Sequence, residues 1–361
     1  MSVQSGTEWS VVESEGLDAI AFLGALSGVP LYLGEYPTET PEFSARLAPA
    51  VIERLKELTA DASSSGFGLM WPNLANGLSV EGDSTIGEVI DSLDRLGERI
   101  LTHRAELDTW SESDWQWLIR SSPSLRDILI AMREAGFADF RRAKAGSSLA
   151  DRAQELASQL ASFDVVTLDR QLSGKDLTPR IEIVLSYFCR PHGVRIHGQR
   201  FIQSPDYDLM TTVRIAAHEL LHPPIDMKGP VATALVEQLE KDKVLVGIVK
   251  GHDPSWGYTT VEGVVDEDIC QALDQLVIEQ LSVARNPADR WHEADGGMHV
   301  LAAGLYGMLR DDGWVKHGGG SIESWLADAL SAGRLEPADL HPVAARVLER
   351  PVDQLWPIDP R

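Results

Sequence analysis

The sequence predicts an α+β protein that is mainly helical and contains one small mixed sheet. Most segments repeat apolar residues at intervals of three and four, the period of an amphipathic helix. Only two runs, both in the second half, combine β-branched and aromatic residues as strands do. The composition is that of a folded protein, because 43% of the 361 residues are hydrophobic and ten are tryptophan. A chain of this length predicts two domains, an all-helical N-terminal region over 1–145 and a second domain over 146–361.

The N-terminal region carries several amphipathic repeats. Their spacing predicts helices over 40–62, 84–107 and 122–137, separated by loops rich in serine, glycine and asparagine. Ser122 or Ser124 is the expected N-cap of the third helix. The region contains no internal repeat and no cluster of catalytic residue types. We expect it to wall one side of a site or to bind a partner.

The second half begins with a predicted helix over 147–163 and then changes character. The run RIEIVLSYF over 180–188 and the run VRIHGQRFIQS over 194–204 predict strands, with Gly198 as a bulge in the second. Helical periodicity then returns. It predicts helices over 208–222, 230–248, 261–283, 298–310, 321–332 and 336–348.

The charge and the cysteine count exclude several classes of protein. A formal net charge of −23 opposes binding to nucleic acid and to anionic membrane surfaces. Cys189 and Cys270 are too few for a disulfide framework, so we expect two buried thiols. The apolar stretch over 17–34 is interrupted by glycine and proline and lacks basic residues before it, which makes it a poor signal peptide or anchor. The chain is therefore expected to be cytoplasmic, and no feature indicates a particular oligomeric state.

The segment TTVRIAAHELLHPPID, residues 211–226, contains the most informative motif. Two histidines stand four apart on a predicted helix, which two prolines end directly after His222. Side chains at positions i and i+4 share one face, so His218 and His222 can hold one zinc ion. Glu219 projects from the same turn and can reach a water on that ion without being a ligand.

A catalytic zinc ion needs a third protein ligand and one open position. The segment GYTTVEGVVDEDICQALDQL, residues 257–276, offers Glu262 and Asp266 on one face of a predicted helix. We expect Glu262 to bind the zinc ion through a carboxylate oxygen. We expect Asp266 to accept a hydrogen bond from the second ring nitrogen of a ligand histidine, which fixes the tautomer. Glu267 is the main alternative third ligand if the helix has a different register.

HELLH followed forty residues later by EGVVD resembles the gluzincins, the thermolysin-like clan of zinc metallopeptidases. The resemblance covers residues 194–276 and implies a zincin-like catalytic domain within 146–361. It implies these roles: His218 and His222 as ligands, Glu219 as general base, Glu262 as third ligand and Asp266 as the outer partner of a ligand histidine. It also places the strand over 194–204 along the cleft, where it could pair with an extended peptide.

The predicted function is that of a zinc metallopeptidase acting on a peptide or protein substrate. Glu219 would take a proton from the attacking water while zinc polarises the carbonyl group. A second donor normally holds the developing oxyanion, and Tyr306 is the favoured candidate, with His317 and Tyr258 as alternatives. An alternative hypothesis is a zincin-fold protein that binds metal or peptides without catalysis. A third is a helical interaction protein without metal.

Two further histidines, His292 and His299 in WHEADGGMH, lack helical i, i+4 spacing. The glycines between them oppose a continuous helix. We expect them to be loop or cap residues that could line the cleft.

Overall fold

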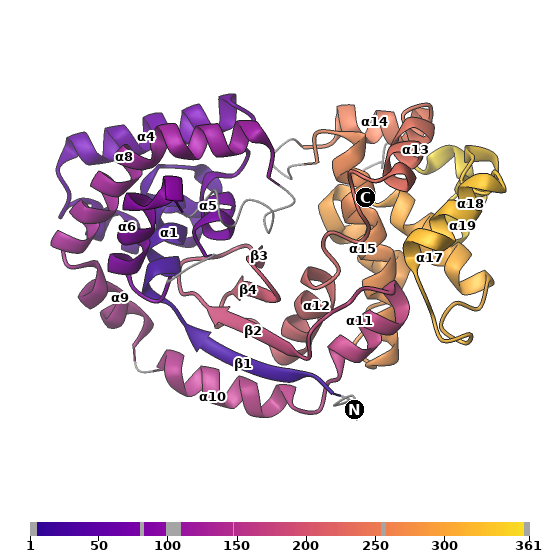
Figure 1. Ribbon diagram of the computed structural model, residues 1–361, viewed down its shortest axis with the longest axis horizontal. Helices are drawn as coiled ribbons and strands as arrows, with labels where there is room; N and C mark the ends of the chain where they lie inside the picture. Colours follow the sequence, from indigo (N-terminus) through magenta and orange to yellow (C-terminus); the bar gives the residue numbers. More distant parts are fainter. Residues whose placement is uncertain (1–5, 80–82, 99–109, 147, 254–257, 357–361) are drawn as a thin grey trace. The chain divides into compact units, whose positions relative to one another are not determined.

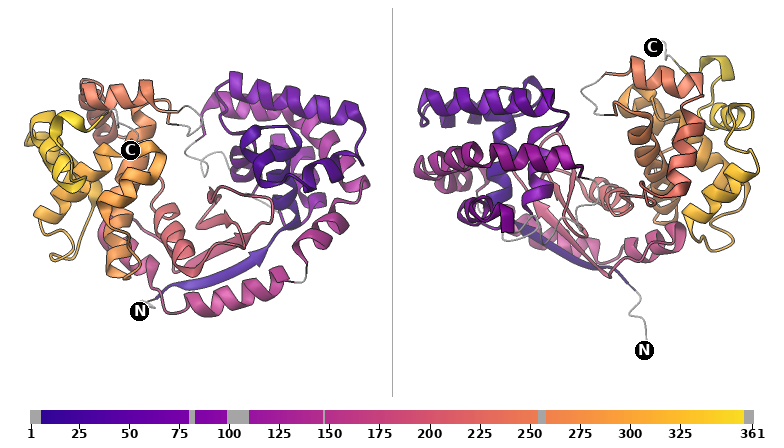
Figure 2. Two further views of the ribbon diagram at one scale, coloured as in Figure 1. Left: turned by 180° about the vertical axis from the view of Figure 1, so that it is seen from behind. Right: turned by 45° about the horizontal axis from the view of Figure 1, so that its top comes forward.

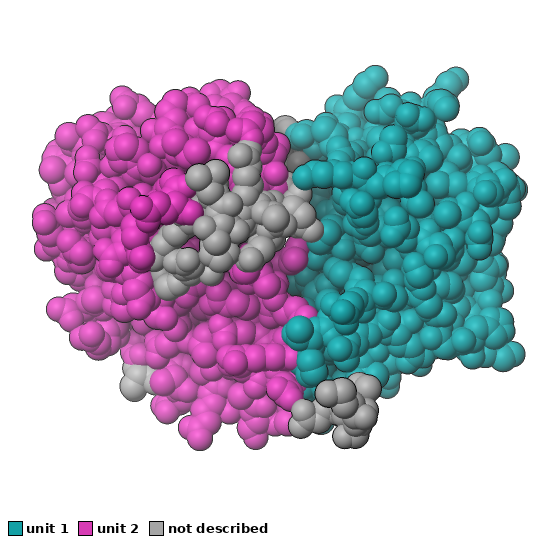
Figure 3. Space-filling view, in the orientation of Figure 1, with its two compact units in different colours: residues 1–7, 162–179, 210–361 teal, residues 8–161, 180–209 magenta. Residues whose placement is uncertain are grey.

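The computed structural model describes residues 6–79, 83–98, 110–146, 148–253 and 258–356. The chain divides into two compact units, coloured separately in Figure 3. Unit 1 comprises residues 1–7, 162–179 and 210–361, and unit 2 comprises residues 8–161 and 180–209. These bounds differ from the expected division at residue 145, because the predicted strands and the helix before them belong with the N-terminal helices.

Unit 2 combines helices with one small sheet (Figure 1). Its elements are β1 (Glu8–Glu13), α1 (Glu15–Leu26), α2 (Pro30–Glu35), α3 (Glu39–Ser44), α4 (Pro49–Ser64), α5 (Met70–Leu78), α6 (Ile86–Asp94), α8 (Glu112–Glu134), α9 (Phe137–Ala145), α10 (Ser148–Leu160), β2 (Arg180–Leu185), β3 (Val194–Ile196) and β4 (Arg200–Gln203). The part of the predicted helix 84–107 beyond residue 98 lies outside the described residues.

The sheet has the strand order β1-β2-β4-β3. β2 pairs in parallel with both β1 and β4, whereas β3 pairs antiparallel with β4. Both views of Figure 2 show α10 running alongside β1, and the two elements are in contact. The prediction of a mainly helical α+β fold with a small mixed sheet is therefore confirmed.

The prediction of an all-helical N-terminal region is wrong, because the run EWSVVE forms β1. This strand pairs with β2 over its whole length and places Val11 opposite Ile183. Its partner is more than 160 residues away along the chain, so only the folded sheet shows that the short run is a strand.

The segment over 194–204 forms two strands rather than one. β3 and β4 are joined by a turn in which Gly198 has a φ of 77°, a left-handed conformation that favours glycine. Gly198 therefore marks a turn and not a bulge. Both strands belong to unit 2, whereas HELLH belongs to unit 1, and the pairing of this segment with a peptide stays a prediction.

Helix α8 begins well before the predicted start at residue 122. Ser111 is the N-cap and forms a capping box with Asp114, and Pro123 lies inside the helix. Ser122 and Ser124 are therefore helical residues rather than caps. Pro123 and the serines beside it have the pattern of a helix start, which explains the late predicted start.

Unit 1 is almost entirely helical. Its elements are α11 (Val165–Ser173), α12 (Leu209–Glu219), α13 (Pro230–Leu239), α14 (Lys243–Gly251), α15 (Val261–Gln280), α16 (Pro287–Glu293), the 3₁₀ helix η2 (Ala294–Gly297), α17 (Val300–Asp311), α18 (Ile322–Ser331), α19 (Pro337–Val347) and the 3₁₀ helix η3 (Val352–Gln354). Among the described residues, no helix is both long enough and apolar enough to cross a membrane.

Helix α15 is the centre of unit 1. It contacts α11, α13, α14 and α17, and its residues are buried on almost every face from Val264 to Ile278. Three acidic residues, Glu267, Asp268 and Asp274, are buried among them. A buried charge is costly unless it is paired or coordinates a metal ion, so these residues need partners.

Candidate metal centre

The two histidines of HELLH meet at the end of α12. The helix ends at Glu219, so His218 is helical and His222 lies in the following turn. We expected the helix to continue to His222. The Leu221 N–H instead donates to the His218 carbonyl at 3.0 Å, which tightens the chain. The imidazoles still converge, with 3.1 Å between their Nε2 atoms.

Helix α15 supplies a carboxylate at the same point. Glu267 Oε1 lies 3.5 Å from His218 Nε2, and Glu267 Oε2 lies 3.5 Å from His222 Nε2. Two ligand atoms on one tetrahedral zinc ion, each at about 2.0–2.1 Å, are separated by about 3.3–3.4 Å. The three groups are therefore spaced as ligands of one ion would be.

The structure does not bring Glu262 to this centre. Glu262 is exposed in the first turn of α15 and is not among the groups that converge. Five residues separate it from Glu267, which amounts to about 140° around a helix and about 7.5 Å along it. The structure therefore brings Glu267, the alternative considered from the sequence, to the two histidines in place of Glu262, because α15 presents a different face to them.

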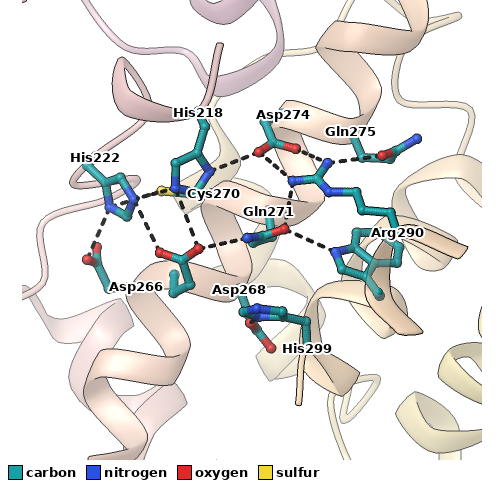
Figure 4. A network of polar contacts seen from close by, with 12 residues as sticks. His218, His222, Asp266, Asp268, Cys270, Gln271, Asp274, Gln275, Arg290 and His299 are labelled. Atoms are coloured by element: carbon teal, nitrogen blue, oxygen red, sulfur yellow. Dashed lines mark hydrogen bonds and ion pairs between the residues drawn. The ribbon is translucent and has the colours of Figure 1, made fainter. Parts of the chain in front are cut away.

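The Nδ1 atom of each histidine contacts a carboxylate, as Figure 4 shows. Asp266 Oδ2 lies 3.2 Å from His222 Nδ1, which is the contact expected for Asp266. Asp274 Oδ2 lies 2.9 Å from His218 Nδ1, a contact that sequence reasoning missed. A proton on Nδ1 that is donated to a carboxylate leaves the Nε2 lone pair free for a metal ion.

The signal for Asp274 was present in the chain. Glu267 and Asp274 stand seven apart with Gln271 between them, so they share one face of α15.

A polar network fixes these carboxylates. Gln271 Nε2 donates to Glu267 Oε1 at 2.8 Å, and its own amide oxygen accepts a hydrogen bond from Arg290. Arg290 also donates to both carboxylate oxygens of Asp274 (Figure 4). The guanidinium on α16 therefore orients a carboxylate behind His218 and the amide that holds Glu267.

The charges of the centre are strongly coupled. Burial alone would raise the pKa of Glu267, but His218 and His222 outweigh it and hold that pKa well below its usual range. Burial alone would lower the pKa of His218, but Glu267 and Asp274 outweigh it and raise that pKa well above its usual range. The carboxylates thus favour positive charge on two imidazoles that are in contact, and one divalent cation can replace their protons.

No protein-family model, curated protein or solved structure matches this chain. The centre must therefore be judged by its own chemistry.

A second group of potential ligands, His222, Asp266 and Cys270, also lies within 4.8 Å. It contains only one histidine, and that histidine presents Nδ1, which already contacts Asp266. Cys270 Sγ is 3.4 Å from the same nitrogen, and burial raises the pKa of this thiol. The group with two Nε2 atoms and Glu267 is the better metal site.

Tyr306 does not join the centre. Its hydroxyl donates to Glu279 and accepts a hydrogen bond from Arg310. Glu279 lies twelve residues beyond Glu267 on α15, or about 18 Å along the helix axis. The expected role for Tyr306 is therefore corrected to that of a core tyrosine with a polar tip. His317 is exposed in the loop after α17 and is placed no better.

Tyr258 lies within electrostatic reach of the predicted general base. Burial, followed by the charge of Glu267, raises the pKa of the Tyr258 hydroxyl, and the charge of Glu219 contributes in the same direction. Glu219 is half-buried at the end of α12, directly after His218. Of the three candidate oxyanion donors, Tyr258 is thus the one that shares the surroundings of Glu219 and Glu267.

A buried histidine lies behind this region. His299 is completely buried and places Nδ1 2.6 Å from Asp268 and Nε2 3.0 Å from Asp295. The ring of Tyr258 packs edge-on against its ring. We expected a loop or cap residue, and His299 is indeed the N-cap of α17, but its imidazole forms an internal ion pair.

Proposed function

We propose that this chain is a zinc-dependent metallopeptidase of the zincin type, with His218, His222 and Glu267 as the zinc ligands. The observation that supports the proposal is the convergence of two Nε2 atoms and one carboxylate at 3.1–3.5 Å. Two imidazoles and a carboxylate suit zinc, and three protein ligands are typical of a catalytic rather than a structural zinc site.

The proposed ligand set differs from the gluzincin pattern in one of its three ligands. The glutamate that faces the histidines follows Asp266 in the sequence, whereas the motif EGVVD has its glutamate before that aspartate. Asp266 nevertheless lies against His222, and Asp274 adds a second such contact to His218. The proposed ligands are still two imidazoles and one glutamate carboxylate, but the glutamate lies on a different face of α15.

When bound, zinc would supply Lewis acidity toward a carbonyl oxygen and would make a water more acidic. We assign to Glu219, which directly follows His218, the role of accepting a proton from the attacking water and passing it to the leaving amine. Asp266 and Asp274 would keep both ligand imidazoles in the tautomer with a free Nε2. Arg290 and Gln271 hold Asp274 and Glu267 in their orientations.

Tyr258 is the proposed oxyanion donor in place of Tyr306. Its hydroxyl stays protonated at neutral pH because burial and the nearby carboxylates disfavour the phenolate. A neutral hydroxyl can donate a hydrogen bond to developing negative charge. Its ring packs against His299, which contacts Asp268 beside Glu267, and this position supports the role.

The test compares two glutamates on α15. Purified wild-type protein is expected to contain stoichiometric zinc. Glu267→Gln should weaken zinc binding by more than about 100-fold, because losing a ligand costs more than the 10–100-fold typical of outer contacts. Glu262→Gln, the matched control, should bind zinc as the wild type does. Chelator competition measures both affinities, and the reverse result would refute the ligand assignment.

Catalysis is tested separately with Glu219→Gln. This variant should keep its zinc and lose hydrolysis of a peptide library by about 10²–10⁴-fold, the usual contribution of a general base. If wild type and variant both bind zinc and neither cleaves any peptide, the non-catalytic alternative replaces the peptidase proposal.

A further inference from the structure

Lys175 makes an unusual set of contacts just behind the centre. Its ammonium group donates to four consecutive backbone carbonyls, those of residues 220, 221, 222 and 223, at distances of 3.0, 2.7, 3.1 and 2.9 Å. These carbonyls belong to Leu220, Leu221, His222 and Pro223. An ammonium has three protons, so the four oxygens share them and surround the charge as they would a monovalent cation.

The position of these carbonyls explains why they need a donor. Helix α12 ends at Glu219, so the carbonyls of residues 220–223 lie beyond the hydrogen bonds of the helix. Pro223 and Pro224 have no N–H groups, so the chain cannot continue the helical hydrogen bonds. The C-terminal end of a helix also carries partial negative charge, which a lysine stabilises.

Lys175 follows a helix that packs against α15, the helix that carries Glu267. This preceding helix is α11, and Gly174 ends it with a left-handed φ of 77°. The Lys175 N–H donates to Ser173 Oγ at 3.1 Å, which orients the start of the residue. The ammonium therefore ties the turn that carries His222 to the helix that carries Glu267.

A buried acid, Asp169, lies within electrostatic reach of this charge. Asp169 on α11 is completely buried, and among the described residues neither of its carboxylate oxygens has a hydrogen-bond partner. Burial raises the pKa of Asp169 well above its usual range, and the charge of Lys175 opposes that effect more than any other group. Asp274 and His218 also lie within its electrostatic reach.

We infer that Lys175 is a positioning residue for the proposed metal site. Its ammonium holds the turn over residues 220–223 so that His222 Nε2 faces His218 and Glu267. The inference rests on the proposed function, because it assigns Lys175 a role in metal affinity rather than in folding alone.

The first test replaces the ammonium with an apolar group of similar length. Lys175→Met is expected to bind zinc about 10–100-fold more weakly, as expected for loss of a contact that orients a ligand. The visible absorption of the cobalt-substituted protein should also change, since it reports ligand geometry. Lys241→Met, at an exposed position between α13 and α14, removes the same charge and should leave both readouts unchanged.

The second test restores the charge chemically. Lys175→Ala removes three carbons and the ammonium, which n-propylammonium can replace. Adding this amine should restore zinc affinity and the cobalt spectrum, whereas 1-butanol should not. The amine also keeps the test informative if Lys175→Met does not fold, because Lys175→Ala can be refolded with it.

The outcomes separate the two proposals. If wild-type protein binds no zinc, the proposed function fails. If wild type binds zinc but Lys175→Met has the same affinity and the same cobalt spectrum, the role of Lys175 is overturned and the metal site stands. If Lys175→Ala is folded and binds zinc with wild-type affinity at every amine concentration, the role is also overturned.

Discussion

Glu267 occupies a position where a carboxylate is normally unfavourable. It is buried on α15, and burial alone would favour its neutral form. Two imidazoles and the amide of Gln271 surround its oxygens and offset that cost. Asp274 is stabilised in the same way by Arg290 and His218. Such buried polar networks are sensitive to single changes, because removing one member leaves the others without partners.

His299 allows a test of this idea away from the proposed ligands. Burial alone would lower its pKa, but the charge of Asp268 and hydrogen bonds to Asp268 and Asp295 outweigh it and raise the pKa to about 10. The charged groups that act most strongly on the ring are the carboxylates of Asp268, Asp295 and Glu267, and the phenol ring of Tyr258 packs against it. The protonated imidazole is thus the only positive charge in this set.

We predict that His299→Gln destabilises the metal-free protein by about 3–5 kcal/mol near pH 6, because Asp268 is left buried without its counter-charge. A raised folded pKa means that this stabilisation is complete below about pH 6.5 and is lost as the pH rises through about 10. The difference between wild type and variant should therefore shrink with rising pH. Urea unfolding at several pH values measures it, and a difference that does not depend on pH would contradict the prediction.

At the scale of elements, α15 determines which carboxylates reach the site, because one face of this buried helix carries a row of polar side chains. Glu267, Gln271 and Asp274 form this row, whereas Glu262 and Asp266 lie on another face. A helix rotates rigidly, so the packing of α15 against α11 and α17 determines which acid reaches the histidines. Helix α17 in turn is packed closely on α19.

The contact between α17 and α19 depends on Gly307. A Cβ at this position would lie 2.4 Å from Val343 Cγ1 and 2.9 Å from Val347 Cγ2, closer than real contacts allow. We predict that Gly307→Ala destabilises the protein by about 1–2 kcal/mol, because overpacking exceeds the gain in helix propensity. In the control, Gly247→Ala, the new Cβ would meet Trp356 at 3.5 Å, an ordinary contact, so stability should not fall. Urea unfolding compares them, and equal effects would contradict the prediction.

At the scale of the whole molecule, neither unit is one continuous stretch of chain. Strand β1 pairs with β2 over all six of its residues, and the core of unit 2 joins Phe188 and Ile202 to the N-terminal helices. Thr7 in turn belongs to unit 1, where it donates to Asp164. A division near residue 145 therefore cuts through both the sheet and its core.

We predict that a chain starting at residue 146 does not unfold cooperatively. It lacks β1, so β2 would expose an open edge that favours aggregation. The full chain, prepared in the same way, should show a cooperative urea transition. A cooperative urea transition of the shorter chain would refute the prediction.

The sequence by itself determined the parts of the molecule that depend on local pattern. HELLH brought two imidazoles together, Asp266 was found against one of them, and both cysteines are buried free thiols. The spacing of the two histidines, the aspartate on the later helix and the small number of cysteines can all be read directly from the chain.

Tertiary structure decided the features that depend on how distant segments pack. The choice of Glu267 over Glu262 required the rotation of α15, which neighbouring helices impose. Strand β1 required its partner at residues 180–185. Tyr258 and Lys175 were placed by loops whose course no short-range pattern encodes. The rotation of a helix and the pairing of a strand depend on how side chains from the whole unit are buried. Patterns within a short stretch of sequence do not contain this information.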